Sequence, residues 1–287
     1  MSILLDGLSL GAIYALIALG YTMVYGIAKL LNFAHGDIIM VGAYAILVML
    51  NLTGNPWLGI LVSVLVCTLA GIVIEWLAYR PLRGASPLAV LITAIGVSYF
   101  LQGVAQLFFG AQARPFTLPA FRMIPIAGAQ ISTGTIITLI VGALIMAGLT
   151  LFVKRTRTGR AMQAVSEDRG AAQLMGINVN RIIMITFAIG SALAAFASLF
   201  YLMQIPSTSP TLGAMPGIKA FTAAVIGGIG SIPGAMIGGV LLGLIEKICM
   251  SVPAISGYTT AIEFSLLILI LLVKPIGILG KKRRVKV

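Results

Sequence analysis

Long apolar runs separated by short polar connections dominate the chain. A helix needs about 20 mainly apolar residues to span the hydrocarbon core of a membrane. Apolar runs suited to this lie near residues 7–27, 33–52, 57–79, 88–109, 134–153, 182–204, 215–250 and 258–273. The pattern predicts a polytopic membrane protein built from helices.

The run at 215–250 is too long for a single crossing. Its middle, "GGIGSIPGAMIGG" at 227–239, holds glycines and a proline that break a helix. We therefore expect two shorter elements around a Gly/Pro turn, and eight or nine crossings in all. The predicted fold class is all-α: one integral membrane helical bundle over residues 1–287, with short Gly-rich elements.

Two connections are long. Residues 110–133 contain three prolines and predict a cap or hairpin outside the membrane. Residues 154–181 are rich in helix-forming residues from Arg160 to Met175, with Gly170 as the single glycine inside that stretch. This connection predicts a short surface helix, or a pair of them, held at the membrane face.

Composition agrees with this picture. The chain is 60% hydrophobic, has a mean hydropathy of +1.10 and carries 9% charged residues, against about 25% in soluble domains. The net charge of +12 comes from short basic clusters between apolar runs. No nucleic-acid-binding motif accompanies them, so they indicate topology rather than a nucleic-acid partner.

Lysine and arginine counts orient the bundle. With 154–181 inside, the inner loops and the C-terminal "KKRRVKV" hold fifteen of the nineteen basic residues. The outer loops hold Arg114 and Arg122, while Lys219 and Lys247 lie near segment ends and stay unassigned. This bias places 154–181 and the C-terminus in the cytoplasm, and nine crossings would place the N-terminus outside.

The sequence argues against catalysis. One histidine, two separated cysteines and seven scattered carboxylates form no metal-ligand spacing. The G-x-S-x-G letters at 7–11 lie in an apolar run predicted to be a membrane helix and form no strand-to-helix elbow, and no G-x-x-x-x-G-K-[ST] phosphate loop is present in the sequence. We therefore expect a protein that is not an enzyme and holds no cofactor, so any ATP that drives it must bind another chain.

Four carboxylates lie inside apolar runs, where a charge is costly and faces the bundle interior or a wet cavity. Glu75 is close to Arg80 and Glu246 is next to Lys247, which favours structural pairs. Asp37 and Glu263 have no neighbouring base in the sequence. For these two, a place on a substrate pathway and a structural role both remain open.

The stretch "LLNFAHGDIIMVGAY" at 30–44 gathers Asn32, His35 and Asp37 at the start of an apolar run. Asn32 could cap the second helix, and on a helix Asn32 and His35 would share a face. The three side chains are either a polar helix start satisfied by neighbouring helices or a polar patch on a permeation path.

Glycines are dense between 227 and 243. Several are spaced as G-x-x-x-G, which allows close packing of helices in lipid. A broken helix whose free N–H groups face a cavity is the alternative. The glycines expected to serve as packing or hinge positions are Gly227, Gly228, Gly230, Gly234 and Gly238.

The sequence resembles the LivH-type permease subunits of branched-chain amino acid ABC importers over nearly its whole length. The segments that carry the resemblance are "ALIALGYTMVYGIAKLLNFAHGDIIMVGAY" (15–44), "RPLRGASPLAVLITAIGVSYFLQ" (80–102), "TGRAMQAVSEDRGAAQLMGINVNR" (158–181), "FTAAVIGGIGSIPGAMIGG" (221–239) and "KPIGILG" (274–280). Permeases for urea and short-chain amides share the Asn-Phe-Ala-His-Gly stretch, which leaves those substrates as the alternative.

The resemblance implies a multi-pass subunit in the bacterial inner membrane. Its partners would be a homologous LivM-type permease, two cytoplasmic ATPases that bind ATP and magnesium, and a periplasmic binding protein. Residues 154–181 would hold the coupling helix, with Arg160, Ala171, Ala172 and Gly176 acting toward the ATPase, although Gly170 replaces the family's glutamate. The hypothesis drawn from the polar residues themselves is that Asn32, His35, Asp37 and Glu263 line the substrate pathway. A proton-coupled secondary transporter using Asp37 or Glu263 is the rival class.

Overall fold

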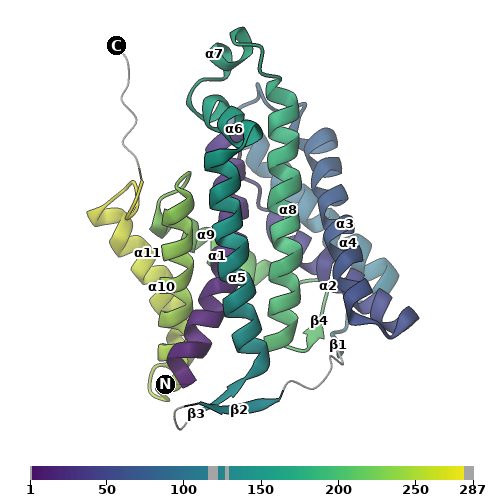
Figure 1. The fold of residues 1–287 in the computed structure, drawn as a ribbon, viewed down its shortest axis with the longest axis vertical. Helices are drawn as coiled ribbons and strands as arrows, with labels where there is room; N and C mark the ends of the chain where they lie inside the picture. Colours follow the sequence, from purple (N-terminus) through teal and green to yellow (C-terminus); the bar gives the residue numbers. More distant parts are fainter. Residues whose placement is uncertain (1, 116–121, 127–128, 281–287) are drawn as a thin grey trace.

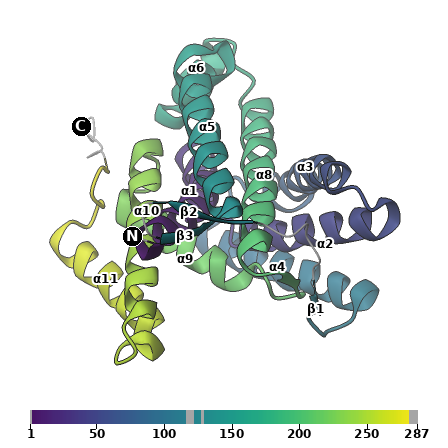
Figure 2. The same cartoon turned by 60° about the horizontal axis from the view of Figure 1, so that its bottom comes forward.

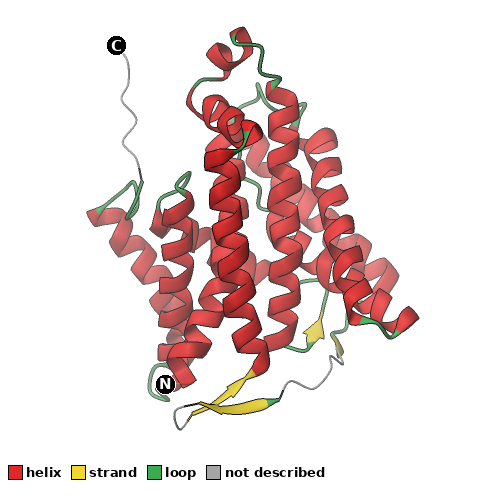
Figure 3. Ribbon diagram, viewed as in Figure 1, coloured by secondary structure: helices red, strands yellow, loops and turns green. Residues whose placement is uncertain are grey.

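The computed structural model is a bundle of long helices with short strands at one end (Figure 1, Figure 3). It describes residues 2–115, 122–126 and 129–280. The helices are α1 (Ser2–Ala28), α2 (His35–Thr53), α3 (Pro56–Ile74) continued by the π-helix η1 (Glu75–Tyr79), α4 (Pro87–Phe109), α5 (Thr133–Arg155), α6 (Arg157–Glu167), α7 (Arg169–Leu174), α8 (Val179–Gln204), α9 (Ala214–Gly227), α10 (Ile232–Ser251), the 3-10 turn η2 (Ser256–Tyr258) and α11 (Thr259–Val273). The strands are β1 (Arg114–Pro115), β2 (Met123–Ile126), β3 (Ala129–Ser132) and β4 (Ser207–Thr208).

Eight helices in the described part are long and apolar enough to cross a membrane. They coincide with the predicted runs, which confirms the all-α membrane bundle. The predicted break in 215–250 is also present, because residues 228–231 separate α9 from α10. The prediction of two shorter elements is therefore confirmed: α10 has 20 residues, and α9 has 14 and extends only about 21 Å.

Contacts assign the helix ends to two sides. Arg169 of α7 donates a hydrogen bond to the Ala28 carbonyl at the end of α1. The Ile278 and Leu279 N–H groups bond the Ile226 and Gly227 carbonyls at 2.8 and 2.9 Å, capping the end of α9. The start of α1 lies at the opposite end, beside β2 and β3 (Figure 1). The described chain thus begins on the side of the strands and ends on the side of α6 and α7. This requires nine crossings, and α9 with the loop before it forms the ninth.

The basic residues follow the same division. In the described loops Arg114 and Arg122 lie on the side of the strands. The predicted asymmetry is therefore confirmed for the described residues, while the basic residues of 281–287 lie outside them. The basic residues on the side of α6 and α7 are Lys29, Arg80, Arg83, Lys154, Arg155, Arg157, Arg160, Arg169, Arg181 and Lys274.

Helix α1 is the centre of the bundle, and it is covered by α8, α9 and α10 (Figure 2). It crosses α10 closely at Gly11, where an added Cβ would lie 2.7 Å from the Val240 Cα. The missing side chain of this glycine therefore allows the close approach. At the periphery, α11 buries only Thr259 and Glu263. Its other contacts with the core come from the partly buried side chains of Leu266, Leu267 and Ile270.

The predicted packing role of the 227–243 glycines is confirmed for Gly227, Gly234 and Gly238. A Cβ at any of the three would collide with the backbone of the facing helix. Gly228 and Gly230 instead form the turn, with φ of +106° and +92°. The N–H groups of Gly228 and Ser231 bond the Ala224 and Gly228 carbonyls, and residues 278–279 bond the carbonyls that end α9. Ile229 of this break is among the residues that line a small cavity.

The loop 110–133 contains the predicted hairpin. Strands β2 and β3 pair antiparallel with Met123 opposite Ser132 and Ile126 opposite Ala129. Strand β1 pairs with β4, which ties this loop to the segment after α8. The connection 154–181 is the predicted pair of helices, α6 and α7.

Candidate functional site

Asn32 does not cap the second helix, so that prediction was wrong. Helix α2 begins at His35, and its N-cap residue, Ala34, makes no side-chain cap hydrogen bond. Asn32 lies in the loop before the helix, where its Oδ1 accepts a hydrogen bond from the Tyr79 hydroxyl at 2.8 Å. It therefore shares no helical face with His35.

The three polar side chains of 30–44 point toward different helices. His35 packs edge-on against the Tyr21 ring of α1, with ring centroids 4.8 Å apart. Asp37 accepts a hydrogen bond from Gln102 Nε2 of α4 at 2.9 Å. All of them are at most 2% exposed. His35 Nε2 and Asn32 Nδ2 have no hydrogen-bond partner among the described residues.

Helices α2 and α9 meet at their N-termini. A Cβ on Gly36 would lie 2.6 Å from the Gly213 carbonyl oxygen and 3.2 Å from the Gly217 Cα, so the backbones touch. The His35 ring lies against Gly20 of α1. Gly20 is eight residues before the C-terminal end of α1. The junction of α2 and α9 therefore lies about 12 Å from that end, measured along the helix axis. The N-termini of two helices thus meet within the bundle, where their helix dipoles favour negative charge.

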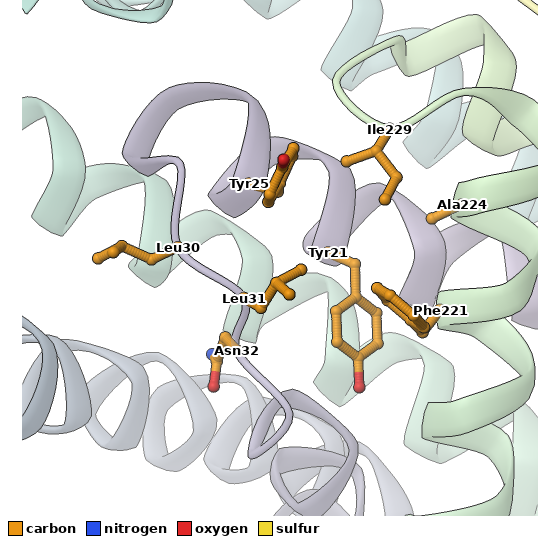
Figure 4. A pocket seen from close by; sticks show the side chains of 8 residues that line it. All are labelled: Tyr21, Tyr25, Leu30, Leu31, Asn32, Phe221, Ala224 and Ile229. Atoms are coloured by element: carbon orange, nitrogen blue, oxygen red, sulfur yellow. The ribbon is translucent and has the colours of Figure 1, made fainter. Parts of the chain in front are cut away.

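A small cavity adjoins this junction (Figure 4). Tyr21 and Tyr25 of α1, Leu31 and Asn32 of the loop, and Phe221 of α9 are among its lining residues. Its volume is about 10 Å³, which accommodates one water molecule. An amino acid does not fit, so the junction is closed in this conformation.

A second polar group lies between α9, α10, α11 and α1. Lys219 Nζ lies 2.7 Å from Glu246 Oε1 and 3.2 Å from Glu263 Oε2. The Tyr14 hydroxyl donates to Glu246 Oε2 at 2.7 Å. We call Tyr14, Lys219, Glu246 and Glu263 the α9 charge cluster. The prediction that Glu246 pairs with Lys247 was wrong, because its partner is Lys219. Glu263 also pairs with Lys219, a base distant in sequence.

Sequence reasoning missed this cluster because Lys219 was left unassigned. A usable signal existed: Lys219 lies within the apolar segment 214–227, and a lysine there needs a carboxylate partner. The carboxylates available in other apolar segments included Glu246 and Glu263.

Glu75 also has another partner than expected. Its carboxylate pairs with Arg83 rather than with Arg80, and Arg83 also donates to Asn180 near the start of α8. The π-helical turn η1 carries Glu75 and Tyr79 into the interior. Partial burial and then the positive charge of Arg83 lower the pKa of the Arg169 guanidinium below its ordinary value. The guanidinium groups of Arg83 and Arg169 thus lie near the single carboxylate of Glu75.

Helices α6 and α7 form an arm outside the membrane segments (Figure 1). Asp168 ends α6 and caps α7 by accepting from the Ala171 N–H at 3.0 Å. The stretch is therefore two helices joined at Asp168, which is the second of the two arrangements that the sequence predicts. At the end of the arm, Leu174 and Met175 are 91% and 83% exposed.

The predicted coupling residues occupy different positions on this arm. Arg160, Ala171 and Gly176 are exposed, whereas Ala172 is buried. Gly176 has φ of +81°, and a Cβ there would meet nothing within 4 Å. Its backbone conformation, and not lack of space, is what requires glycine. Among the described residues, no three His, Cys, Asp or Glu side chains gather to hold a metal ion.

Comparison with known proteins gives consistent matches. The sequence model described as "Branched-chain amino acid transport system / permease component" matches residues 3–273. The chain is 46% identical to the high-affinity branched-chain amino acid transport system permease protein BraD of Pseudomonas aeruginosa, over 99% of this chain and 97% of that one. It is 44% identical to the permease protein LivH of Escherichia coli K12, over 98% and 96%.

A solved structure shares the fold. The chain is similar to a structure of PsaBC from Streptococcus pneumoniae in complex with Fab, with a TM-score of 0.52. The match has 17% sequence identity and covers 96% of this chain and 93% of that one. At this identity the likeness supports the helical arrangement alone.

Proposed function

The chain belongs to the family of branched-chain amino acid transport system permease components. From this premise we propose that it moves leucine, isoleucine and valine into the cell, as a membrane subunit of an ABC importer. The observation that carries the proposal is the family match over residues 3–273. The 46% identity to a permease with that named substrate class supports it over the whole length.

We propose that the chain works with a homologous LivM-type permease, two cytoplasmic ATPases and a periplasmic binding protein. The ATPases would bind ATP and magnesium, and this chain would hold no cofactor. The basic residues on the side of α6 and α7 support placing that side in the cytoplasm. This orientation fits a multi-pass protein of the bacterial inner membrane.

The function is tested by uptake with the purified complex in vesicles. We expect ATP-dependent entry of radiolabelled leucine when the binding protein is present outside, and little entry of urea or acetamide. Urea uptake equal to leucine uptake would instead support the alternative assignment, a permease for urea or short-chain amides. Uptake by this chain alone, driven by a proton gradient, would contradict the importer assignment.

The arm formed by α6 and α7 is the proposed contact with the ATPase. Leu174 and Met175 present apolar side chains at its end, and Arg160 and Ala171 are exposed on its surface. Ala172 is buried, so its proposed role is to hold α7 in place rather than to touch a partner. The hydrogen bond from Arg169 to Ala28 would pass movement of the arm to the end of α1.

Gly176 gives a test of this arm. A valine at φ of +81° is strained, so Gly176→Val is expected to distort the junction of α7 and α8 and to uncouple ATP hydrolysis from uptake. Asparagine tolerates this region of backbone conformation, and Gly176→Asn is expected to keep most uptake. The measurement is the ratio of leucine transported to ATP hydrolysed. Normal coupling in an assembled Gly176→Val complex would contradict a role for this junction.

The junction of α2 and α9 is the proposed part of the substrate pathway. Discontinuous helices with N-termini inside the membrane often bind anionic substrate groups. Opening the Gly36–Gly213 contact would expose His35, Asn32 and Asp37 next to two helix N-termini that favour a substrate carboxylate. Glu263 pairs with Lys219, and we now propose a structural role for it instead.

His35→Leu distinguishes a pathway from packing. Leucine keeps a buried apolar volume but removes the ring nitrogen that has no partner. If His35 meets the substrate, the KM for leucine uptake is expected to rise about tenfold, the equivalent of one lost hydrogen bond to a charged group, with normal assembly. The control is Tyr44→Phe, which removes another buried group on α2 without a described partner. Unchanged KM in both variants would leave His35 with a packing role alone.

A further inference from the structure

The α9 charge cluster contains more acid than base. The titratable groups that face it are Tyr14 of α1, Tyr201 of α8, Lys219 of α9, Glu246 of α10 and Glu263 of α11. If all carboxyl groups were ionised, two negative charges would face one ammonium group. A buried net charge within a membrane segment is costly, and such groups neutralise by binding a proton.

The two carboxyl groups have unequal surroundings. Glu246 receives the Lys219 ammonium at 2.7 Å on Oε1 and the Tyr14 hydroxyl at 2.7 Å on Oε2, so both of its oxygens are stabilised as a carboxylate. Glu263 is 1% exposed, and its closest approach to Lys219 is 3.2 Å. Its Oε1 accepts a longer hydrogen bond from Lys219 Nζ at 3.4 Å, and its Oε2 accepts none of suitable geometry among the described residues. Both carboxyl groups contact the same Lys219 ammonium, which places them next to each other.

We propose that Glu263 is a resident proton-binding site, with its carboxylic acid donating a hydrogen bond to ionised Glu246. Lys219 and Glu246 then carry one opposite charge each, and the cluster is neutral. Neutrality lets α11, which buries only two residues, dock on the short helix α9 within lipid. The proton is structural and is not transported, so the inference stands whatever solute the chain carries.

Infrared difference spectroscopy of the purified complex tests the proposal. At pH 8, where exposed carboxyl groups are ionised, the spectrum of wild type minus Glu263→Gln is expected to show the carbonyl-stretch band of a protonated carboxylic acid. Asp37→Asn is the control for a buried carboxyl group outside the cluster and should leave that band in place. Glu263→Asp retains an acid and should shift the band, which provides a second measurement if the glutamine variant does not assemble.

Transport supplies an independent readout. Glutamine mimics a protonated glutamate, so Glu263→Gln is expected to keep leucine uptake and membrane abundance within about twofold of wild type. The double variant Glu246→Gln with Glu263→Gln leaves Lys219 without an anion and should lose both. Loss of carboxylate bands alone in Glu263→Gln would overturn the proposal. A protonated band that persists there and disappears in Glu246→Gln would place the proton on the other residue and equally overturn it.

Discussion

Replacing Lys219 with methionine is expected to remove most of the permease from the membrane and to abolish uptake. The substitution keeps the length of the side chain but leaves Glu246 and Glu263 without their cation. Removing one partner of a buried ion pair costs about 3–5 kcal/mol, a large part of the roughly 5–15 kcal/mol that stabilises a folded protein. Quantitative immunoblots of membranes and thermal unfolding of the purified complex measure the effect.

A compensating variant separates charge from packing. Combining Lys219→Met with Glu246→Gln and Glu263→Gln removes every formal charge from the cluster while keeping the side-chain volumes similar. We expect this triple variant to recover much of the lost abundance, because neutral replacements of buried ion pairs are often tolerated. If Lys219→Met alone assembles as well as wild type, the cluster does not stabilise the bundle.

The second large effect is expected at the end of the arm. Changing both Leu174 and Met175 to aspartate places two charges on side chains that are 91% and 83% exposed. Because these side chains touch little of their own chain, the permease should still fold. Buried interface anchors each contribute about 2 kcal/mol or more, so loss of both should weaken ATPase binding at least a hundredfold. Co-purification of the ATPases and leucine-stimulated ATP hydrolysis measure it.

Gln163→Asp is the matched control for this charge change. Gln163 is an exposed residue of α6 on the same arm, so the variant adds negative charge nearby without touching the apolar end. It should keep the ATPases bound. If the two-aspartate variant retains them as well, the docking surface lies elsewhere on the cytoplasmic side.

Apolar run length was sufficient to predict most helices, because a membrane helix satisfies its own backbone hydrogen bonds and needs little else from the sequence. The break near Gly228 was also predictable, since its glycines and Pro233 are local signals. The length of α10 was not, because nothing in the run showed that the break would be displaced toward one end.

Pairing between distant segments was much harder to predict. Arg80 and Lys247 were chosen as partners for their closeness in sequence, whereas the structure pairs Glu75 with Arg83 and Glu246 with Lys219. Asn32 was expected to act locally as a cap and instead reaches Tyr79. In each case the direction of the side chain depends on how helices cross, which no local pattern encodes.

The cap that Ile278 and Leu279 place on the end of α9 also orders events during biosynthesis. Helix α9 leaves the ribosome well before α11 and the segment that follows it, yet its last carbonyls and one of the two carboxyl partners of Lys219 are supplied by those later residues. When the short α9 first reaches the insertion machinery, its last carbonyls therefore lack these hydrogen bonds and its lysine lacks one carboxyl partner. Its final position in the bundle depends on the later entry of α11 into the membrane, so a later helix completes an earlier one.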